Sequence, residues 1–315
     1  MIDRQAMIVL DRKGWWRAIF FGQGTTWSKI WRRVVITTLL AVLVTFLHER
    51  YEVFHVNLTT TPFALIGLAL SIFLGFRNNT SYDRFWEGRK LWGRMVNVSR
   101  SFARQVDTFV DASDEDTRAA TRTELVLRQV AYVHAFRMHM RKVRDPESLA
   151  AYLDPEEVSA MAAEDNPPLV ILRGTAARLR QLWKEGRIDV FHLRALDDSL
   201  TEITTVQGAC ERISSTPIPY VYTVLMHRIV AVYCLALPFG LITTAGLATP
   251  FVVLMISYAF YGIDAVGEEI EDPFGIDAND LPLHAISTMI EINLREHLGL
   301  EDAPARRSPE KHILC

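Results

Sequence analysis

A run of 20 consecutive residues without a formal charge, residues 57–76, constrains this chain more than any other stretch. About 20 apolar residues in an α-helix are enough to cross the hydrocarbon core of a lipid bilayer. The run is followed at once by a charged segment that begins at Arg77 and contains tryptophan. The sequence therefore predicts a membrane-spanning helix whose end at Phe76 marks one membrane surface.

Two neighbouring stripes on this predicted helix carry side chains of different size. Large apolar residues four apart form one stripe: Leu68, Ile72 and Phe76. Small residues at the same spacing form the other, and such residues let membrane helices approach closely: Gly67, Ser71 and Gly75. Around a symmetry axis the large stripe would make an apolar ring that excludes water, whereas on a single helix it would face lipid or core. Periodicity alone favours the second interpretation.

The composition indicates a membrane part joined to a sizeable soluble part. Half of the 315 residues are hydrophobic, yet 23% are charged. The net charge of −3 gives no basic field that would favour nucleic acid. No nucleophile motif or metal-ligand spacing is present; His134 and His139, for example, are five residues apart and do not share a helix face. The sequence thus predicts neither an enzyme nor a nucleic-acid-binding protein.

The distribution of basic residues predicts a cytoplasmic N-terminus. Residues 1–33 contain seven Lys or Arg and four Trp, which is typical of a segment at an anionic membrane surface. An uncharged run at residues 34–48 predicts a first span, and the connection after it carries one basic residue, Arg50. Since basic residues accumulate on the cytoplasmic side, this connection is expected outside the cell.

Two further spans are predicted in residues 213–263, which contain one formally charged residue, Arg228. At about 1.5 Å rise per residue, this stretch is long enough for two helices and a tight turn around Gly246. Pro219 and Pro238 are expected to start or bend the third span, and Pro250 to open the fourth. Both termini are then expected in the cytoplasm.

The remaining sequence predicts an all-α cytoplasmic part. Apolar residues in 77–212 recur with a 3.6-residue rhythm, and no segment there alternates with a period of two. Long helices are expected at roughly 115–142 and 189–213, with prolines separating shorter ones between them. The expected organisation is an interfacial segment at 1–33, spans one and two at 34–76, a helical domain at 77–212, spans three and four at 213–263, an acidic loop and helix at 264–299, and a disordered tail at 300–315.

An acidic segment follows the predicted fourth span. Residues 268–283 carry six carboxylates around the turn-forming Pro273 and Gly275. Clustered oxygen ligands are what Ca²⁺ requires, but the spacing is not that of an EF-hand. The alternative is a solvated loop, or one whose carboxylates pair with arginines of the nearby basic helices, because the guanidinium group matches carboxylate geometry.

Several stretches taken together resemble one family, the bestrophins, and especially their bacterial branch. FLGFRNNTSYDRFWEGRKLWG, at residues 73–93, resembles the end of the bestrophin second span. ERISSTPIPYVYTVLMHRIVAVYCLALPFGL, at 211–241, is similar to the entry to the third span. DPFGIDANDLPL, at 272–283, resembles the segment after the fourth span, and WSKI at 27–30 is similar too. The match covers nearly the whole chain in the same order.

This resemblance implies a homopentameric ion channel in the inner (cell) membrane, with an axial pore for small monovalent ions. The pore-lining neck of the family maps onto Leu68, Ile72 and Phe76. A second constriction, a cytosolic aperture, maps onto Phe191, with Ile188 as the alternative. Selectivity for chloride-type anions or for Na⁺ and K⁺ stays open, because an apolar neck carries no charge.

The resemblance also implies where a calcium clasp would lie. In animal bestrophins a clasp binds Ca²⁺ after the fourth span, and its ligands map onto four acidic residues: Glu269, Asp272, Asp277 and Asp280. The unbroken acidic run of animal members is reduced here to IDAND. No cofactor is therefore expected to be required, and a calcium requirement is doubtful.

Two other functions remain open. A secondary transporter would need paired repeats and polar sites at the membrane midplane, whereas these spans are almost free of ionisable residues. A membrane-anchored scaffold or signalling protein would keep the spans but lack a lined pore.

Overall fold

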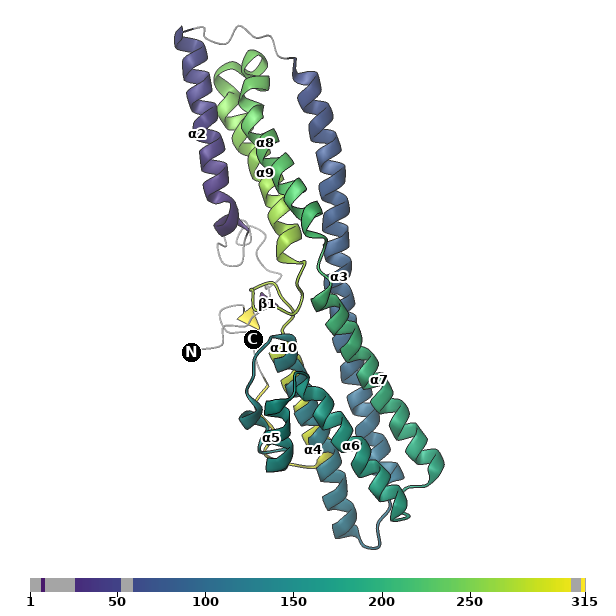
Figure 1. Cartoon of the computed structure of the whole chain (residues 1–315). Helices are drawn as coiled ribbons and strands as arrows, with labels where there is room; N and C mark the ends of the chain where they lie inside the picture. Colours follow the sequence, from purple (N-terminus) through teal and green to yellow (C-terminus); the bar gives the residue numbers. More distant parts are fainter. Residues whose placement is uncertain (1–6, 9–25, 52–58, 307–312, 315) are drawn as a thin grey trace. The chain divides into compact units, whose positions relative to one another are not determined.

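The computed structural model describes residues 7–8, 26–51, 59–306 and 313–314, and these are mostly helical (Figure 1). The chain forms two compact units, each described here by itself. The membrane unit comprises Asp11–Phe85 and Pro217–Asp272. The bundle unit comprises Met1–Leu10, Trp86–Thr216 and Pro273–Cys315. The long helix α3 contributes residues to both units.

The membrane unit is built from long apolar helices: α2 (Trp27–Tyr51), the first half of α3 (Thr60–Phe109), α8 (Tyr220–Ala245), a 3-10 turn η2 (Gly246–Ala248) and α9 (Thr249–Glu269). Three helical stretches are long and apolar enough to cross a membrane: Trp27–Tyr51, Thr60–Phe109 and Tyr220–Glu269, the last of which contains α8, η2 and α9. The second apolar run continues beyond Phe76 as one long helix, since α3 has 50 residues.

Proline and glycine set the boundaries of α8 and α9 as the sequence predicts. Pro219 is the residue before α8, and Pro250 lies in the first turn of α9. Proline is tolerated there because the N–H groups of the first turn have no acceptor within the helix. Pro238 lies inside α8. Gly246 ends α8 with φ 49°, a left-handed conformation that favours glycine.

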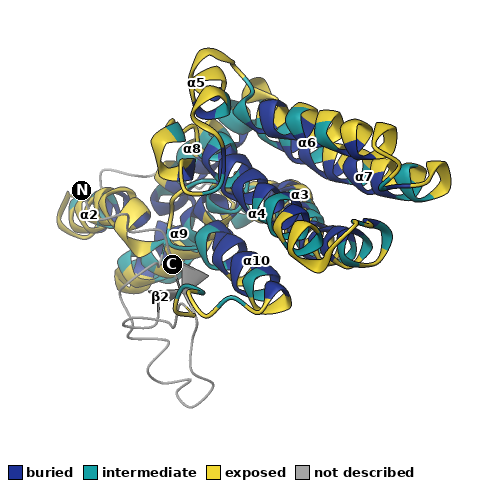
Figure 2. Ribbon diagram, turned by 90° about the horizontal axis from the view of Figure 1, so that it is seen from below, coloured by how far each residue is buried: buried dark blue, intermediate teal, exposed yellow. Residues whose placement is uncertain are grey.

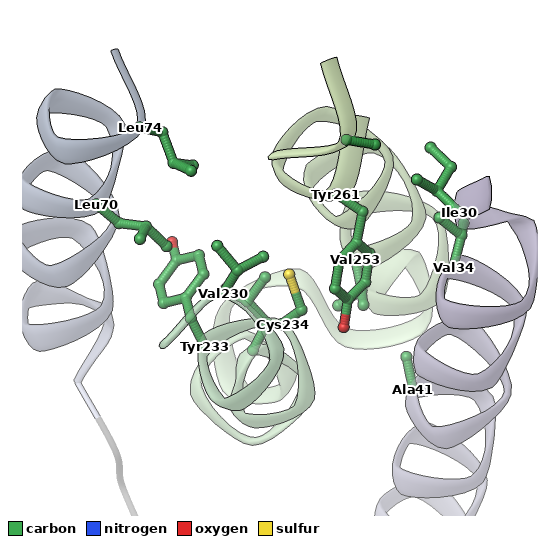
Figure 3. Packing of buried hydrophobic residues seen from close by; sticks show 12 residues of the cluster. Ile30, Val34, Ala41, Leu70, Leu74, Val230, Tyr233, Cys234, Val253 and Tyr261 are labelled. Atoms are coloured by element: carbon green, nitrogen blue, oxygen red, sulfur yellow. The ribbon is translucent and has the colours of Figure 1, made fainter. Parts of the chain in front are cut away.

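The core of the membrane unit joins all four helices. Figure 3 shows Ile30, Val34 and Ala41 of α2 on one side of this cluster and Leu70 and Leu74 of α3 on the other. Residues of α8 and α9 fill the space between them: Val230, Tyr233, Cys234, Leu237, Val253, Tyr261 and Ala265. Most of these side chains are almost wholly buried. Full burial of a Val, Leu or Ile side chain contributes about 1.5–3 kcal/mol to the stability of the fold.

The bundle unit consists of the second half of α3 together with further helices: α4 (Glu115–Met140), the 3-10 helix η1 (Pro146–Leu149), α5 (Pro155–Ala163), α6 (Pro167–Lys184), α7 (Val190–Ser215) and α10 (Leu283–Leu298). The prolines predicted to punctuate this region begin η1, α5 and α6. Figure 2 shows α6, α7 and α10 each with a buried side and an exposed side, as amphipathic helices around a core should be. The all-α prediction is confirmed for this region.

Aspartate caps fix the starts of the two long helices. Asp114 accepts a hydrogen bond from the backbone N–H of Thr117, and Asp189 accepts from Phe191 and His192. These bonds satisfy backbone donors that the first helical turn leaves unpaired. Hydrogen bonding to Thr117 lowers the pKa of Asp114, and hydrogen bonding to His192 lowers that of Asp189.

The two ends of the chain are only partly described. Two short strands, β1 (Met7–Ile8) and β2 (Ile313–Leu314), pair antiparallel with Met7 opposite Leu314. The sequence did not predict this pairing. Most of the expected interfacial segment at residues 1–33 and much of the expected disordered tail at 300–315 lie outside the described residues.

A buried polar network holds α10 to the rest of the bundle unit. The Glu291 carboxylate accepts hydrogen bonds from His134 Nε2 at 2.8 Å, Tyr152 Oη at 2.7 Å and Arg295 Nε at 2.9 Å. Burial opposes the charge of Glu291, but the bonds from His134 and Tyr152 outweigh it and lower the pKa to about 2. A carboxyl group with a lowered pKa stabilises the fold above its ordinary pKa, and this contribution is lost as the pH falls toward the lowered value.

We expect Gly67→Ala to destabilise the membrane unit, because an added Cβ would lie 2.5 Å from Tyr233 Oη. Overpacking of this kind costs about 1–3 kcal/mol. The apparent melting temperature in detergent should fall, and Tyr233→Phe should restore part of the loss by removing the hydroxyl. Gly75→Ala is the matched control, since no described atom lies within 4 Å of its added Cβ. An equal loss in both glycine variants would contradict this assignment.

We expect Glu291→Gln to lower the apparent melting temperature at pH 7 but progressively less as the pH falls from about 4.5 toward 2. The charge of Glu291 is present in the parent only above this range, where it contributes at most about 3 kcal/mol. Melting at pH 7, 5 and 3 tests this, with the exposed Glu301→Gln as control. A deficit that does not change with pH would mean that shape, not charge, is responsible.

Candidate functional site

One face of α3 in the membrane unit exposes large apolar side chains. Leu68 is 62% exposed, Ile72 51% and Phe76 63%, although Leu70 and Leu74 on the same helix are buried. The three exposed residues have the four-residue spacing of a single helical stripe. An exposed apolar stripe of this size needs lipid, another copy of the chain or a narrow pore against it.

The stripe of small residues next to it is divided between two environments. Gly67 is buried against the ring of Tyr233 from α8 of the same chain, whereas Ser71 and Gly75 are exposed. Within the chain, Gly67 thus packs against α8, and contact of this stripe with the second span of a neighbouring subunit stays a prediction. The backbone of α3 does approach another helix closely at Gly67, but that helix is α8. Ser71 and Gly75 alone remain open for a contact between subunits.

A buried ion pair lies where α3, α8 and α9 meet. Arg77 Nη1 donates to Asp264 Oδ1 at 2.6 Å, and both side chains are at most 1% exposed. His227 Nδ1 lies 2.7 Å from the other oxygen, Oδ2, and Arg33 Nη1 lies 3.9 Å from it. A carboxylate can only accept hydrogen bonds, so His227 donates through Nδ1. Asp264 thus links all four helices of the membrane unit.

Sequence reasoning missed this cluster, although a signal was present. Each uncharged run ends at an ionisable residue: Arg33 precedes the first run, Arg77 follows the second and Asp264 follows the last. Ends that lie at the same membrane surface in antiparallel helices bring such residues to one level. His227 of α8 completes the cluster.

The two aperture candidates differ sharply in exposure. Phe191, in the first turn of α7, is 81% exposed, whereas Ile188 is 3% exposed. Asp189 caps α7 between them and so fixes where the helix begins. Only Phe191 can therefore contribute its side chain to an opening outside the subunit core.

The acidic residues in the membrane unit make contacts within the protein. Glu269 Oε2 lies 2.9 Å from Lys29 Nζ. Glu271 accepts the backbone N–H of Ile218 through its carboxylate at 3.0 Å and the Nε of Arg84 through its carbonyl at 3.1 Å. Lys29 thus pairs with one carboxylate of this segment, whereas Arg84 binds a backbone carbonyl, and pairing of the carboxylates with arginines stays a prediction.

The acidic residues in the bundle unit form a turn. Asp280 accepts the backbone N–H of Asp277 at 2.6 Å, and the backbone N–H of Asp280 returns a bond to the Asp277 carbonyl at 3.1 Å. Asp280 is 5% exposed. Within the described ranges, no group of three or more His, Cys, Asp or Glu side chains is placed to hold a metal ion.

The part of α3 in the bundle unit exposes basic residues. Its exposed cations are Arg89, Lys90, Arg94, Arg100 and Arg104. Glu202 on α7 accepts from Arg94 Nη2 at 2.8 Å, and Asn293 on α10 accepts from Arg100 Nε at 3.1 Å. A groove of about 1160 Å³ between α3 and α10 is lined by four of these cations together with apolar residues such as Ile286 and Met289. This face can concentrate anions.

Comparisons with known proteins agree with this architecture. The model of the bacterial/fungal bestrophin family matches residues 7–296. The voltage-dependent anion channel-forming protein YneE of Escherichia coli K12 is 39% identical over 306 residues, which cover 97% of this chain and 99% of that protein. A voltage-dependent anion channel-forming protein of Ralstonia nicotianae is 37% identical and covers 96% and 99% of the two chains.

Solved structures give the same relationship. The crystal structure of a bacterial bestrophin homologue from Klebsiella pneumoniae superimposes with a TM-score of 0.81 at 35% identity. The match covers 86% of this chain and 99% of that one. The family match spans almost the whole sequence and includes both units. This chain belongs to the bacterial/fungal bestrophin family.

Proposed function

We propose that this protein is an ion channel of the inner membrane, formed by five copies around one axial pore through which small monovalent ions diffuse. Each copy crosses the membrane four times, through α2, the first part of α3, α8 and α9, with both termini in the cytoplasm. The names of the bestrophin relatives, which are channel-forming proteins, support this function.

The observation that carries the proposal is the exposed apolar stripe of α3. Leu68, Ile72 and Phe76 are more than half exposed while the opposite side of the helix is buried in the subunit core. Five such stripes facing an axis would make three rings of apolar side chains. A narrow apolar neck controls ion passage because water and hydrated ions leave it readily.

We assign a preference for anions to this channel. The exposed face of α3 in the bundle unit has five cations, of which Arg94 pairs with Glu202 on α7. Its acidic residues, Glu87 and Asp107, already pair with Arg212 and Arg122. Uncompensated cations near a permeation path raise the local concentration of anions such as chloride. The anion-channel names of the relatives are consistent with this sign.

A second constriction is assigned to Phe191. Its side chain is exposed at the start of a capped helix, and five copies would give a ring of aromatic side chains. Ile188 is buried among the side chains of its own subunit and is not assigned to the pore.

The two rival functions have weaker support. A secondary transporter needs polar substrate sites at the membrane midplane. The buried charged side chains of the described spans, Arg77 and Asp264, pair instead with each other. A scaffold would keep the spans without a pore, and the channel-forming names of the relatives favour a channel over it.

We expect the triple variant Leu68→Ala, Ile72→Ala and Phe76→Ala to conduct more current than the parent. Smaller side chains widen the neck and remove the apolar surface that expels water. Single-channel current in planar bilayers measures this effect, and assembly is checked by light scattering. The matched control is Ile66→Ala, another exposed apolar residue of α3, which lies about 120° around the helix from Ile72. Unchanged conductance in a correctly assembled triple variant would place the constriction elsewhere.

The same recordings in asymmetric salt distinguish the candidate functions. A channel gives a reversal potential set by the permeant ion alone, a transporter one that depends on a coupled ion, and a scaffold gives no current. An anion preference shifts the potential toward the chloride equilibrium value. A shift toward the cation equilibrium value would still indicate a channel, but one that prefers cations, and would contradict the assigned anion preference.

We propose that the acidic segment is structural and that calcium is not required. Asp280→Ala should lower the melting temperature, because the Asp280 carboxylate accepts the backbone N–H of Asp277 and closes the turn. Neither Asp280→Ala nor Asp277→Ala should change any calcium response of the current. Titration of Ca²⁺ from nanomolar to millimolar, with current and melting temperature recorded, tests both effects. A saturable micromolar response that Asp277→Ala abolishes would restore the clasp.

A further inference from the structure

A pocket opens beside the buried ion pair, between α2, α8 and α9. Its volume is about 360 Å³, within the range of small-ligand pockets, and its lining comes from all three helices: Arg33, Ile36, Thr37, His227, Arg228, Ala231, Leu235 and Tyr261. The pore stripe of α3 does not line it. The role of this pocket is therefore separate from ion conduction.

The pocket lies at the end of the apolar spans. Arg33 immediately precedes the first uncharged run, and Arg228 is the one formally charged residue of the third span. Lys29, one turn before Arg33 on α2, pairs with Glu269, and Trp27 lies 6.0 Å from Tyr258 between ring centroids. Tryptophan, tyrosine and basic residues collect where the hydrocarbon core meets the lipid headgroups. The pocket is therefore at headgroup depth.

The charges that line the pocket are not balanced. Arg77 and His227 already satisfy the two oxygens of Asp264 at 2.6 and 2.7 Å. Arg33 is half exposed and reaches this carboxylate only at 3.9 Å. Arg228 is exposed and makes no hydrogen bond or ion pair within the part of the chain that the structure describes. Two guanidinium groups are thus available to an anion.

His227 lines the pocket with its Nδ1–H directed to Asp264. The donors that an anion needs come from the two arginines, whose planar guanidinium groups suit phosphate oxygens.

The same pocket continues into an apolar wall. Ile36 lies one helical turn beyond Arg33 and is 60% exposed, while Ala231 and Leu235 lie one and two turns beyond Arg228. All three residues lie further into the apolar runs of α2 and α8 than the two arginines do. A soluble anion would leave this surface bare, whereas a molecule with an anionic head and a hydrocarbon tail would cover it.

We propose that this pocket binds the phosphate headgroup of an anionic phospholipid, with Arg33 and Arg228 holding the phosphate and Ile36 and Leu235 contacting the first part of an acyl chain. Bound lipid would fix α2 against α8 at the level of the Arg77–Asp264 pair. The site is a stabilising lipid site on each subunit, not a part of the ion path.

The test is native mass spectrometry of the purified oligomer in detergent, titrated with phosphatidylglycerol, phosphatidylcholine or inorganic phosphate. We expect saturable binding of about one phosphatidylglycerol per subunit and at least tenfold weaker binding of phosphatidylcholine. Melting temperature should rise with phosphatidylglycerol and not with inorganic phosphate at the same concentration. Stabilisation by inorganic phosphate equal to that by the lipid would overturn the proposal in favour of a free-anion site.

The double variant Arg33→Gln/Arg228→Gln should weaken phosphatidylglycerol binding at least tenfold. In this variant Asp264 still accepts its hydrogen bonds from Arg77 and His227. If the double variant does not assemble, lipid binding is measured in the single variant Arg228→Gln. The charge-conserving Arg33→Lys/Arg228→Lys should retain most of the binding. Arg32→Gln is the matched control, because Arg32 lies beside Arg33 on α2 but does not line the pocket. Parent-like binding in the glutamine variants would also overturn the proposal.

Discussion

The buried pair of Arg77 and Asp264 is the interaction on which the membrane unit depends. Removing two charges from water costs several kcal/mol per ion, and the cost is met only when geometry and further hydrogen bonds are good. Here a 2.6 Å contact is joined by His227 from a third helix and approached by Arg33 from a fourth. Loss of one partner would leave the other charge buried, which typically costs 3–5 kcal/mol. The four helices are therefore linked at this level through one carboxylate, that of Asp264.

Fixing Arg77 also fixes which side of α3 faces outward. Gly67, Leu70, Leu74 and Arg77 recur every three or four residues and are all buried, so they define the inner face of the helix. The apolar stripe ending at Phe76 must then lie on a different face and stay exposed. A helix that is apolar on every side would rotate freely in lipid; the close contact of Gly67 with Tyr233 and the ion pair remove that freedom.

Local sequence signals predicted the elements but not their partners. Hydrophobic runs, prolines at the starts of α5, α6 and α9, and Gly246 placed most boundaries correctly because each acts within a few residues. The Arg77–Asp264 pair joins positions 187 residues apart, and nothing local links them. The partner of Gly67 could not be foreseen for the same reason: glycine spacing predicts close approach, not the helix that approaches. Phe191 and Ile188 differ in burial, which requires the whole bundle to be folded.

The chain has a net charge of −3, yet the surfaces with proposed roles are basic, and the reason is how charges pair. Acidic residues on these surfaces form ion pairs with nearby arginines, as Asp264 does with Arg77 and Glu202 with Arg94. The excess of carboxylates is exposed elsewhere, for example at Glu147 and Glu156 in the bundle unit. Exposed charges act over about 8 Å at physiological salt, so distant carboxylates do not cancel local arginines. Local pairing, and not net charge, therefore decides which ions or headgroups a surface of this protein attracts.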